Sequence, residues 1–121
     1  MAGNPKILLV EDEALQRLPI EEALLARGFE CRYAGTLGRA LEILTTEHVS
    51  AAILDINIRG AAVFPLAREV RAKGVPCVFT TGYTDAAIPP EFAASPYFQK
   101  PVNIDHVVNA VAACVKQKAD H

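Results

Sequence analysis

Residues 6–12 read Lys6-Ile-Leu-Leu-Val-Glu-Asp12, a short apolar run that ends in two adjacent carboxylates. Almost every position of the run is apolar, which is typical of a strand that is covered on both faces of a sheet. Residues 51–54 and 75–79 have the same character, and residues 31–34 and 96–99 form two weaker runs. These runs predict five strands.

The segments between the predicted strands carry a helical pattern. Apolar positions recur at intervals of three and four behind Thr36 in the second segment and behind Asn103 in the last, and both residues are good N-caps. The apolar positions are Leu37, Ala40, Leu41 and Leu44, and then Ile104, Val107, Val108, Val111 and Val115. Five alternating strand–helix units predict an α/β fold with a parallel sheet and helices on both faces.

Prolines interrupt the pattern in three segments. Pro19 lies about six residues into the first helical segment, where it predicts a kink or a second helix start. Pro65 fits the first turn of a short third helix over residues 64–73. The fourth segment contains Pro89-Pro90, so we expect a short or irregular fourth helix.

Composition narrows the class of protein. The 121 residues are 51% apolar with a net charge of −2, which predicts a single domain over residues 1–121 and excludes a disordered chain. No apolar run reaches the roughly 18 residues of a membrane span, and the start lacks the layout of a secretory signal. We therefore expect a cytoplasmic protein without membrane contact. Scattered Lys and Arg residues argue against direct nucleic-acid binding.

The carboxyl ends of the predicted strands carry the chemistry, because ligands of open parallel sheets bind outside these ends. The first strand ends in Glu11-Asp12, the third in Asp55, the fourth in Thr80-Thr81 and the fifth in Lys100. Three carboxylates held together repel one another unless a cation compensates them, and an all-oxygen site of this kind suits Mg²⁺. A lysine and a hydroxyl beside that ion can hold phosphoryl oxygens. This arrangement places Asp55 to attack a phosphoryl donor.

At these residues the chain resembles the receiver domain of two-component response regulators from end to end. The matching motifs are residues 6–12, Ile53-Leu-Asp-Ile-Asn57, Thr81-Gly-Tyr83 and Lys100-Pro101. The resemblance implies a flavodoxin-like, doubly wound (βα)5 fold with strand order 2-1-3-4-5. It also implies a phosphoacceptor switch, not an enzyme, which receives its phosphoryl group from a sensor histidine kinase or a histidine phosphotransfer protein and exists as a monomer or weak dimer.

The same resemblance implies a metal site. Asp55 is the phosphoacceptor and a metal ligand. Glu11 and Asp12 are the acidic pair that holds Mg²⁺, with Asp12 as a direct ligand. The backbone carbonyl of Asn57 completes the protein ligands of the ion.

Further residues match the switch of the family. Thr81 is the switch hydroxyl, Lys100 the salt-bridge partner of the phosphoryl group and Tyr97 the aromatic switch residue. Pro101 matches a proline that follows the lysine through a cis bond. We choose Thr81 over Thr80 because the small Gly82 follows it and leaves backbone room near a phosphoryl group, and we expect Thr80 to face a flanking helix.

Two features depart from the usual family pattern. Arg59 stands four residues after Asp55, where the family usually has proline, and Pro89-Pro90 degrades the fourth helix. Together with residues 76–83, these features resemble the group of single-domain receivers named for a Phe-Ala-Thr-Gly-Tyr-like motif, with Thr80 in place of the alanine. We therefore expect a stand-alone receiver without an output domain.

The sequence leaves other functions open. A receiver domain excised from a hybrid kinase carries the same motifs. A phosphatase of the haloacid-dehalogenase type also uses an aspartyl nucleophile at a strand end, but that class needs a second aspartate where Asn57 stands. A nucleotide or flavin binder is disfavoured, because no Gly-rich phosphate loop follows the first strand.

Overall fold

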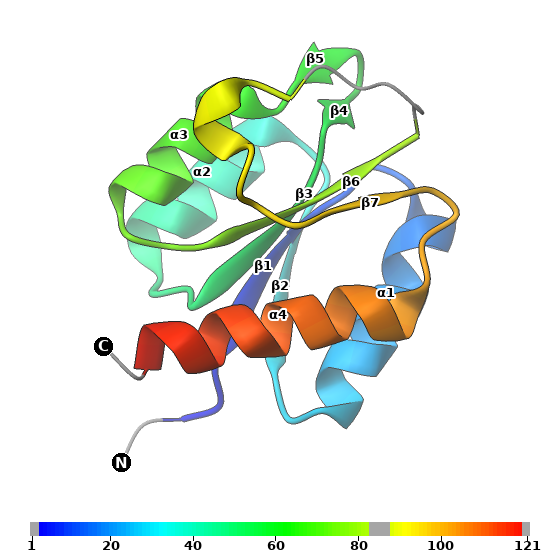
Figure 1. The fold of residues 1–121 in the computed structure, drawn as a ribbon, viewed down its shortest axis with the longest axis vertical. Coiled ribbons are helices and arrows are strands. Elements are labelled where there is room, and N and C mark those ends of the chain that lie inside the picture. Colours follow the sequence, from blue (N-terminus) through cyan, green and yellow to red (C-terminus); the bar gives the residue numbers. More distant parts are fainter. Residues whose placement is uncertain (1–2, 83–87, 120–121) are drawn as a thin grey trace.

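Five strands form a parallel sheet in the order β2-β1-β3-β6-β7 (Figure 1). The computed structural model describes residues 3–82 and 88–119. The strands are β1 (Lys6–Val10), β2 (Glu30–Ala34), β3 (Ala51–Asp55), β6 (Cys77–Thr81) and β7 (Tyr97–Gln99). All neighbouring pairs are parallel. This arrangement confirms the predicted doubly wound α/β fold and the strand order 2-1-3-4-5, counted over these five strands.

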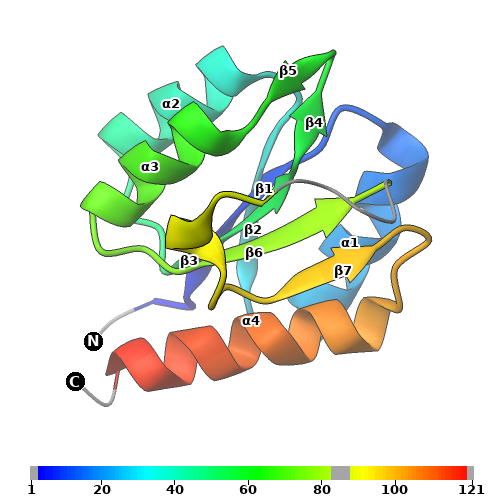
Figure 2. The same ribbon diagram turned by 45° about the horizontal axis from the view of Figure 1, so that its top comes forward.

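Two pairs of helices cover the two faces of the sheet (Figure 2). α1 (Ala14–Ala26) and α4 (Ile104–Ala119) lie on one face, and α2 (Leu37–Thr46) and α3 (Phe64–Ala72) lie on the other. None of the helices in residues 3–82 and 88–119 is long and apolar enough to cross a membrane.

The apolar strand β1 is covered from both sides. Because side chains alternate between the faces of a strand, Ile7 and Leu9 join the core under α1 and α4, whereas Leu8 and Val10 join the core under α2 and α3. All four residues are buried. Burial on both faces explains why the run is apolar at consecutive positions.

The predicted helix starts are confirmed where a side chain caps the helix. The N–H of Arg39 donates to Thr36 Oγ1 at 3.1 Å, and the N–H of His106 donates to Asn103 Oδ1 at 3.1 Å. Each bond satisfies one N–H that the first turn of a helix leaves without a partner. Gly28 follows the C-terminal end of α1. Its φ of +83° is the left-handed conformation that commonly ends a helix.

The bounds of β6 and the course of α1 differ from the prediction, whereas the other predicted bounds shift by no more than one residue. β6 begins at Cys77 instead of residue 75, because Pro76 has no N–H to donate to a neighbouring strand. α1 continues through Pro19, so of the two predicted outcomes the second helix start is wrong, and the kink stays a prediction. Pro19 has no N–H to donate to the Leu15 carbonyl, and Leu15 is 85% exposed, so the helix gives up one hydrogen bond on its solvent side.

Among its described residues, the segment between β6 and β7 holds a 3₁₀ turn and no regular helix, which fits the predicted short or irregular fourth helix. Residues 83–87 lie outside the described residues, and the chain continues with a single 3₁₀ turn, η1 (Pro90–Phe92). Phe92 is buried, and its ring centroid lies 5.4 Å from that of Phe79 and 5.9 Å from that of Phe64. These three aromatic rings anchor η1 to β6 and α3.

A small antiparallel hairpin between β3 and α3 was not predicted. Its strands are β4 (Asn57–Ile58) and β5 (Ala61–Ala62), joined by Arg59 and Gly60 (Figure 1). The φ angles of Arg59 and Gly60 are +52° and +82°. Two left-handed residues in a row are the signature of a type I′ hairpin turn.

Candidate functional site

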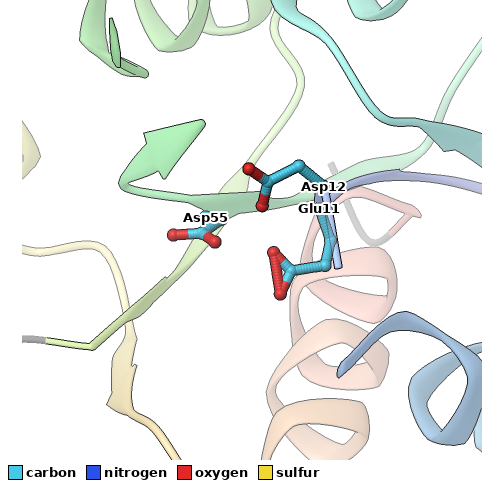
Figure 3. A group of neighbouring side chains, drawn as sticks. All are labelled: Glu11, Asp12 and Asp55. Carbon is cyan, nitrogen blue, oxygen red and sulfur yellow. The ribbon is translucent and has the colours of Figure 1, made fainter. Parts of the chain in front are cut away.

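Three strand ends bring the predicted acidic residues and lysine together at one edge of the sheet. Glu11 and Asp12 directly follow β1, Asp55 is the last residue of β3, and Lys100 directly follows β7. Glu11, Asp12 and Asp55 each offer a carboxylate oxygen, and these atoms lie within 4.8 Å of one another (Figure 3). We call these three residues the acidic cluster.

Lys100 is the counter-charge of the acidic cluster. Glu11 and Asp55 are only 3% and 5% exposed. Lys100 Nζ donates to Glu11 Oε1 at 2.8 Å and to Asp55 Oδ2 at 2.7 Å. One ammonium group cannot neutralise two buried carboxylates and the half-buried Asp12 beside them when all three are ionised. A further cation would compensate the remaining negative charge.

Burial sets the proton affinity of Glu11. Loss of water, together with the neighbouring Asp55 carboxylate, raises the pKa of Glu11 to about 8, and the Lys100 ammonium only partly opposes this rise. Burial alone would lower the pKa of Lys100, but hydrogen bonds to Asp55 and Glu11 raise that pKa above its ordinary value. Lys100 thus keeps its charge at neutral pH, while Glu11 holds a proton when no cation compensates it.

The donor atoms of the acidic cluster fit a hard divalent cation such as Mg²⁺, which prefers oxygen ligands and is commonly held by one or two carboxylates. Glu11, Asp12 and Asp55 are the residues that would hold the ion. Asn57 lies two positions after Asp55, and its N–H donates to Asp55 Oδ1 at 3.1 Å. The role of the Asn57 carbonyl as a further ligand stays a prediction.

The contribution of Arg59 to the site was missed in the sequence. Its N–H donates to Asp12 Oδ2 at 3.1 Å, although the two residues are far apart along the chain. A signal was present, because Arg59-Gly60 separates the apolar residues Ile58 and Ala61 in the way that a two-residue turn separates the strands of a hairpin.

The two predicted switch residues lie in different surroundings. Thr81 is buried at the end of β6, and its carbonyl accepts a hydrogen bond from the Lys100 N–H at 2.7 Å. Tyr97 begins β7 and is 59% exposed. Thr80 lines a small hollow with Lys100 and with Gln16 of α1, so it faces a flanking helix and also borders the acidic cluster. The roles of Thr81 and Tyr97 in switching stay predictions.

The ends of two family motifs, Pro101 and Tyr83, remain to be compared with the structure. The bond between Lys100 and Pro101 is cis, as the resemblance implies. Tyr83, which ends the Thr81-Gly82-Tyr83 motif, lies outside the described residues. Membership in the group of single-domain receivers with that motif therefore stays a prediction.

The sheet and its edge site together define a flavodoxin-like α/β protein with an acid–lysine centre at the carboxyl ends of its strands. The family model of the response regulator receiver domain matches residues 7–112. The chain therefore belongs to the response regulator receiver domain family.

Relatives of this chain include a longer protein and others of matching length. The chain is 33% identical over 104 residues to the aerobic respiration control protein ArcA of Escherichia coli K12, which covers 83% of this chain and 44% of that protein. It thus spans less than half the length of that relative. It is 25% identical over 122 residues to sporulation initiation phosphotransferase F of Bacillus subtilis, with 97% and 98% of the two chains covered. The solution structure of SdrG from Sphingomonas melonis Fr1 matches with a TM-score of 0.79 and 34% identity, covering 95% of this chain and 99% of that chain.

We expect the metal-free protein to lose stability as the pH rises from about 5 to 8.5. Because the pKa of Glu11 is raised from 4.5 to about 8, the folded state holds a proton that the unfolded chain has released. Stability that depends on this proton is fully present below the unfolded pKa and is lost as the pH rises through the folded one. Urea unfolding in EDTA across this range measures the slope.

Two variants test whether Glu11 causes this dependence of stability on pH. Glu11→Gln removes the titrating carboxyl group and should flatten the profile. Glu47→Gln is the matched control, because hydrogen bonds from Lys6 and Arg32 lower the pKa of Glu47 and keep it ionised throughout this range. Its profile should lie lower than that of the wild type with the same slope. A wild-type profile as flat as that of Glu11→Gln contradicts the prediction.

Proposed function

We propose that this chain is the phosphoacceptor of a two-component phosphorelay, in which Asp55 takes a phosphoryl group from a sensor histidine kinase or a histidine phosphotransfer protein. The observation that carries the proposal is the placement of the Asp55 carboxylate. It is 5% exposed, belongs to the acidic cluster and lies 2.7 Å from the Lys100 ammonium. Membership in the receiver family and the phosphotransferase name of the full-length relative support it.

Before transfer, each oxygen of the Asp55 carboxylate accepts a hydrogen bond. Asp55 Oδ1 accepts from the N–H of Asn57 at 3.1 Å, and Oδ2 accepts from Lys100 at 2.7 Å. One of these oxygens attacks phosphorus, and the P–N bond of a phosphohistidine donor breaks. The imidazole leaves with the electron pair and takes up a proton, and Asp55 becomes an aspartyl phosphate.

Charge compensation during transfer comes from Lys100 and from the cation of the acidic cluster. Mg²⁺, when bound, supplies positive charge to the phosphoryl oxygens as they move from donor to acceptor. Lys100 already bonds to Asp55, so it can bond to a phosphoryl oxygen once that carboxylate has become an acyl phosphate. This exchange of partners is the first consequence of phosphorylation that the geometry supports.

The switch would follow from that exchange. The N–H of Lys100 donates to the carbonyl of Thr81, so the ends of β6 and β7 respond together when Lys100 changes partners. We propose that the Thr81 hydroxyl then binds the phosphoryl group and that Tyr97 changes position. Only contacts that differ between the two states can shift their populations, and the phosphoryl group offers such contacts.

We further propose that the chain is a switch and not a turnover enzyme. An aspartyl-phosphate phosphatase needs a general acid beside its nucleophile, and the corresponding position holds Asn57. The amide oxygen of Asn57 accepts a hydrogen bond from the Gly60 N–H at 2.9 Å, which ties this side chain to the hairpin turn. An amide cannot supply the acid–base step of that chemistry.

The relatives support two forms of output. A protein of matching length fits a shuttle that passes the phosphoryl group on or binds a partner, and the longer relative fits the input part of a regulator. In either role the chain works with a phosphohistidine donor made from ATP, so we expect it in the cytoplasm, as a monomer or weak dimer.

Intact mass after incubation with acetyl phosphate and Mg²⁺ tests the proposal. The wild type should gain one phosphoryl group, EDTA should prevent the gain, and Asp55→Asn should show none. Asp105→Asn is the matched control, because Asp105 lies in the first turn of α4 and is not a member of the acidic cluster, and this variant should be modified like the wild type. A wild type that gains no phosphoryl group at any sampling time contradicts the proposed function.

A further inference from the structure

The turn of the β4–β5 hairpin has an uncommon backbone. Arg59 has a φ of +52°, a left-handed conformation that non-glycine residues seldom adopt, because the Cβ atom approaches the following carbonyl. Gly60 follows with a φ of +82°, which glycine adopts without this penalty. Such a conformation at Arg59 persists only where the surrounding contacts outweigh its cost.

The contacts that hold this turn lead to the acidic cluster. The N–H of Arg59 donates to Asp12 Oδ2 at 3.1 Å, and the N–H of Asn57 donates to Asp55 Oδ1 at 3.1 Å. The N–H of Gly60 closes the turn on Asn57 Oδ1 at 2.9 Å. Two carboxylates of the cluster, which come from different strands, are thus held by main-chain donors of one hairpin.

The guanidinium group of Arg59 fastens the turn to a third segment. Arg59 Nε donates to the carbonyl of Gly35 at 3.3 Å, in the connection between β2 and α2. The Tyr33 hydroxyl occupies the space beside Gly35, since a Cβ atom there would lie 2.3 Å from it. The turn is therefore attached at Asp12 on one side and at Gly35 on the other.

We propose that the Arg59-Gly60 turn is the positioning element for Asp12 in Mg²⁺ binding, and that the main-chain N–H of Arg59 is the group that acts. This inference rests on the proposed function. Lys100 orients Glu11 and Asp55 directly, whereas Asp12 receives its bond from the hairpin. That bond is made to Oδ2 of Asp12 and not to Oδ1. The Asp12 carboxylate is therefore held in one orientation before the ion binds.

Pre-orientation matters here because Asp12 is half-buried and would otherwise lose rotamer freedom when the ion binds. Groups that orient metal ligands through hydrogen bonds commonly contribute about 10- to 100-fold to metal affinity. In this proposal, the role of the left-handed turn is to direct the N–H of residue 59 toward Asp12. A side chain at residue 59 is secondary, provided that the backbone conformation is kept.

The test is the Mg²⁺ dissociation constant of the unphosphorylated protein, measured by titration of ¹⁵N-labelled samples and read from amide shifts. Arg59→Pro removes the N–H and cannot adopt the positive φ, so its dissociation constant should rise about tenfold or more. Arg59→Asn keeps the N–H and tolerates the left-handed conformation. Its affinity should stay within about twofold of the wild type, since the group proposed to act is retained.

Gly60→Ala decides the question if Arg59→Pro does not fold. A Cβ atom at Gly60 meets nothing within 4 Å, so the strain is confined to the backbone conformation. Gly28→Ala is the matched control, because Gly28 has a φ of +83° and equally open surroundings, but it lies at the far end of α1. Both variants should lose similar stability, and only Gly60→Ala should weaken Mg²⁺ binding, by about threefold or more.

The results can contradict the role of the hairpin and the proposed function separately. Equal Mg²⁺ affinities for Gly60→Ala and Gly28→Ala overturn the inference. A loss in Arg59→Asn as large as that in Arg59→Pro also overturns it, because the guanidinium group would then be the one that acts. A wild type that binds no Mg²⁺ and gains no phosphoryl group from acetyl phosphate contradicts the proposed function itself, whatever the hairpin variants do.

Discussion

Replacement of Lys100 by methionine is expected to lower the free energy of unfolding of the metal-free protein by about 3 kcal/mol around pH 8. Lys100 Nζ is the hydrogen-bond partner of both Glu11 and Asp55, and both carboxyl groups are almost fully buried. Without the ammonium group, both buried carboxyl groups lose their counter-charge, and Glu11 keeps its proton to a higher pH than in the wild type, because Lys100 no longer lowers its pKa. The loss should therefore shrink as the pH falls. Urea unfolding in EDTA measures it.

Mg²⁺ should restore most of the stability that Lys100→Met loses. A cation that binds only the folded state stabilises it in proportion to the logarithm of its concentration over its dissociation constant. In the variant, no lysine competes with the ion for the same carboxylates. The midpoint of thermal unfolding should consequently rise more with added Mg²⁺ in Lys100→Met than in the wild type.

Lys6→Met is the matched control for this prediction. Lys6 Nζ bonds to Glu47 Oε1 at 2.9 Å, but this pair is only half-buried at the opposite end of β1. Solvent screens such a pair, so its loss should cost much less stability than the loss of Lys100, and Mg²⁺ should have the same effect on Lys6→Met as on the wild type. Equal losses in the two lysine variants would show that the acidic cluster does not depend on Lys100.

Phe79→Ala is expected to remove about 4 kcal/mol of stability. Phe79 is fully buried in the centre of β6, and its ring centroid lies 5.7 Å from that of Phe64 and 5.4 Å from that of Phe92. The substitution deletes most of a ring from a packed core and leaves a cavity that the surrounding strands cannot fill. A loss of this size consumes a large part of the stability of a domain of this length.

The same substitution should loosen η1, because Phe92 packs against Phe79. The N–H of Ser95 bonds to the carbonyl of Phe92 at 3.0 Å, and its exchange with solvent should become faster in Phe79→Ala relative to amides of β1. Tyr97→Ala is the control from the neighbouring strand, since Tyr97 pairs with Phe79 but is exposed. Tyr97→Ala should lower the free energy of unfolding by about 0.5 kcal/mol. Equal losses for the two variants would contradict the role assigned to the aromatic core.

Local patterns in the sequence were sufficient for most of the fold. The runs over residues 7–10 and 51–54 are apolar throughout because strands in the middle of a parallel sheet are buried on both faces. The N-caps Thr36 and Asn103 mark helix starts because a short polar side chain satisfies an N–H of the first turn. Such signals act over a few residues, so they can be read without knowledge of the remaining chain.

The position of the candidate site could also be predicted, for a topological reason. Parallel strands end at the same edge of a sheet, so acids that directly follow two apolar runs must lie near each other once the runs pair. The identity of the acidic residues and of Lys100 therefore followed from their place after a strand. At Pro19 the sequence left a kink or a second helix start open, and the structure excludes only the second start, because whether a helix continues past proline depends on surroundings that no local pattern describes.

What the sequence determined by itself was thus the order of strands and helices along the chain and the edge at which Glu11, Asp12, Asp55 and Lys100 meet. Only the tertiary structure decided how these groups share their charges and hydrogen bonds. The single ammonium of Lys100 reaches two carboxylates from other strands, and the Arg59 N–H reaches Asp12 through a left-handed turn. Distances of this kind, and the raised pKa of Glu11 that follows from them, depend on burial and on contacts between segments distant in sequence. No local pattern encodes them, because their energies arise only when water has been excluded and the strands have paired.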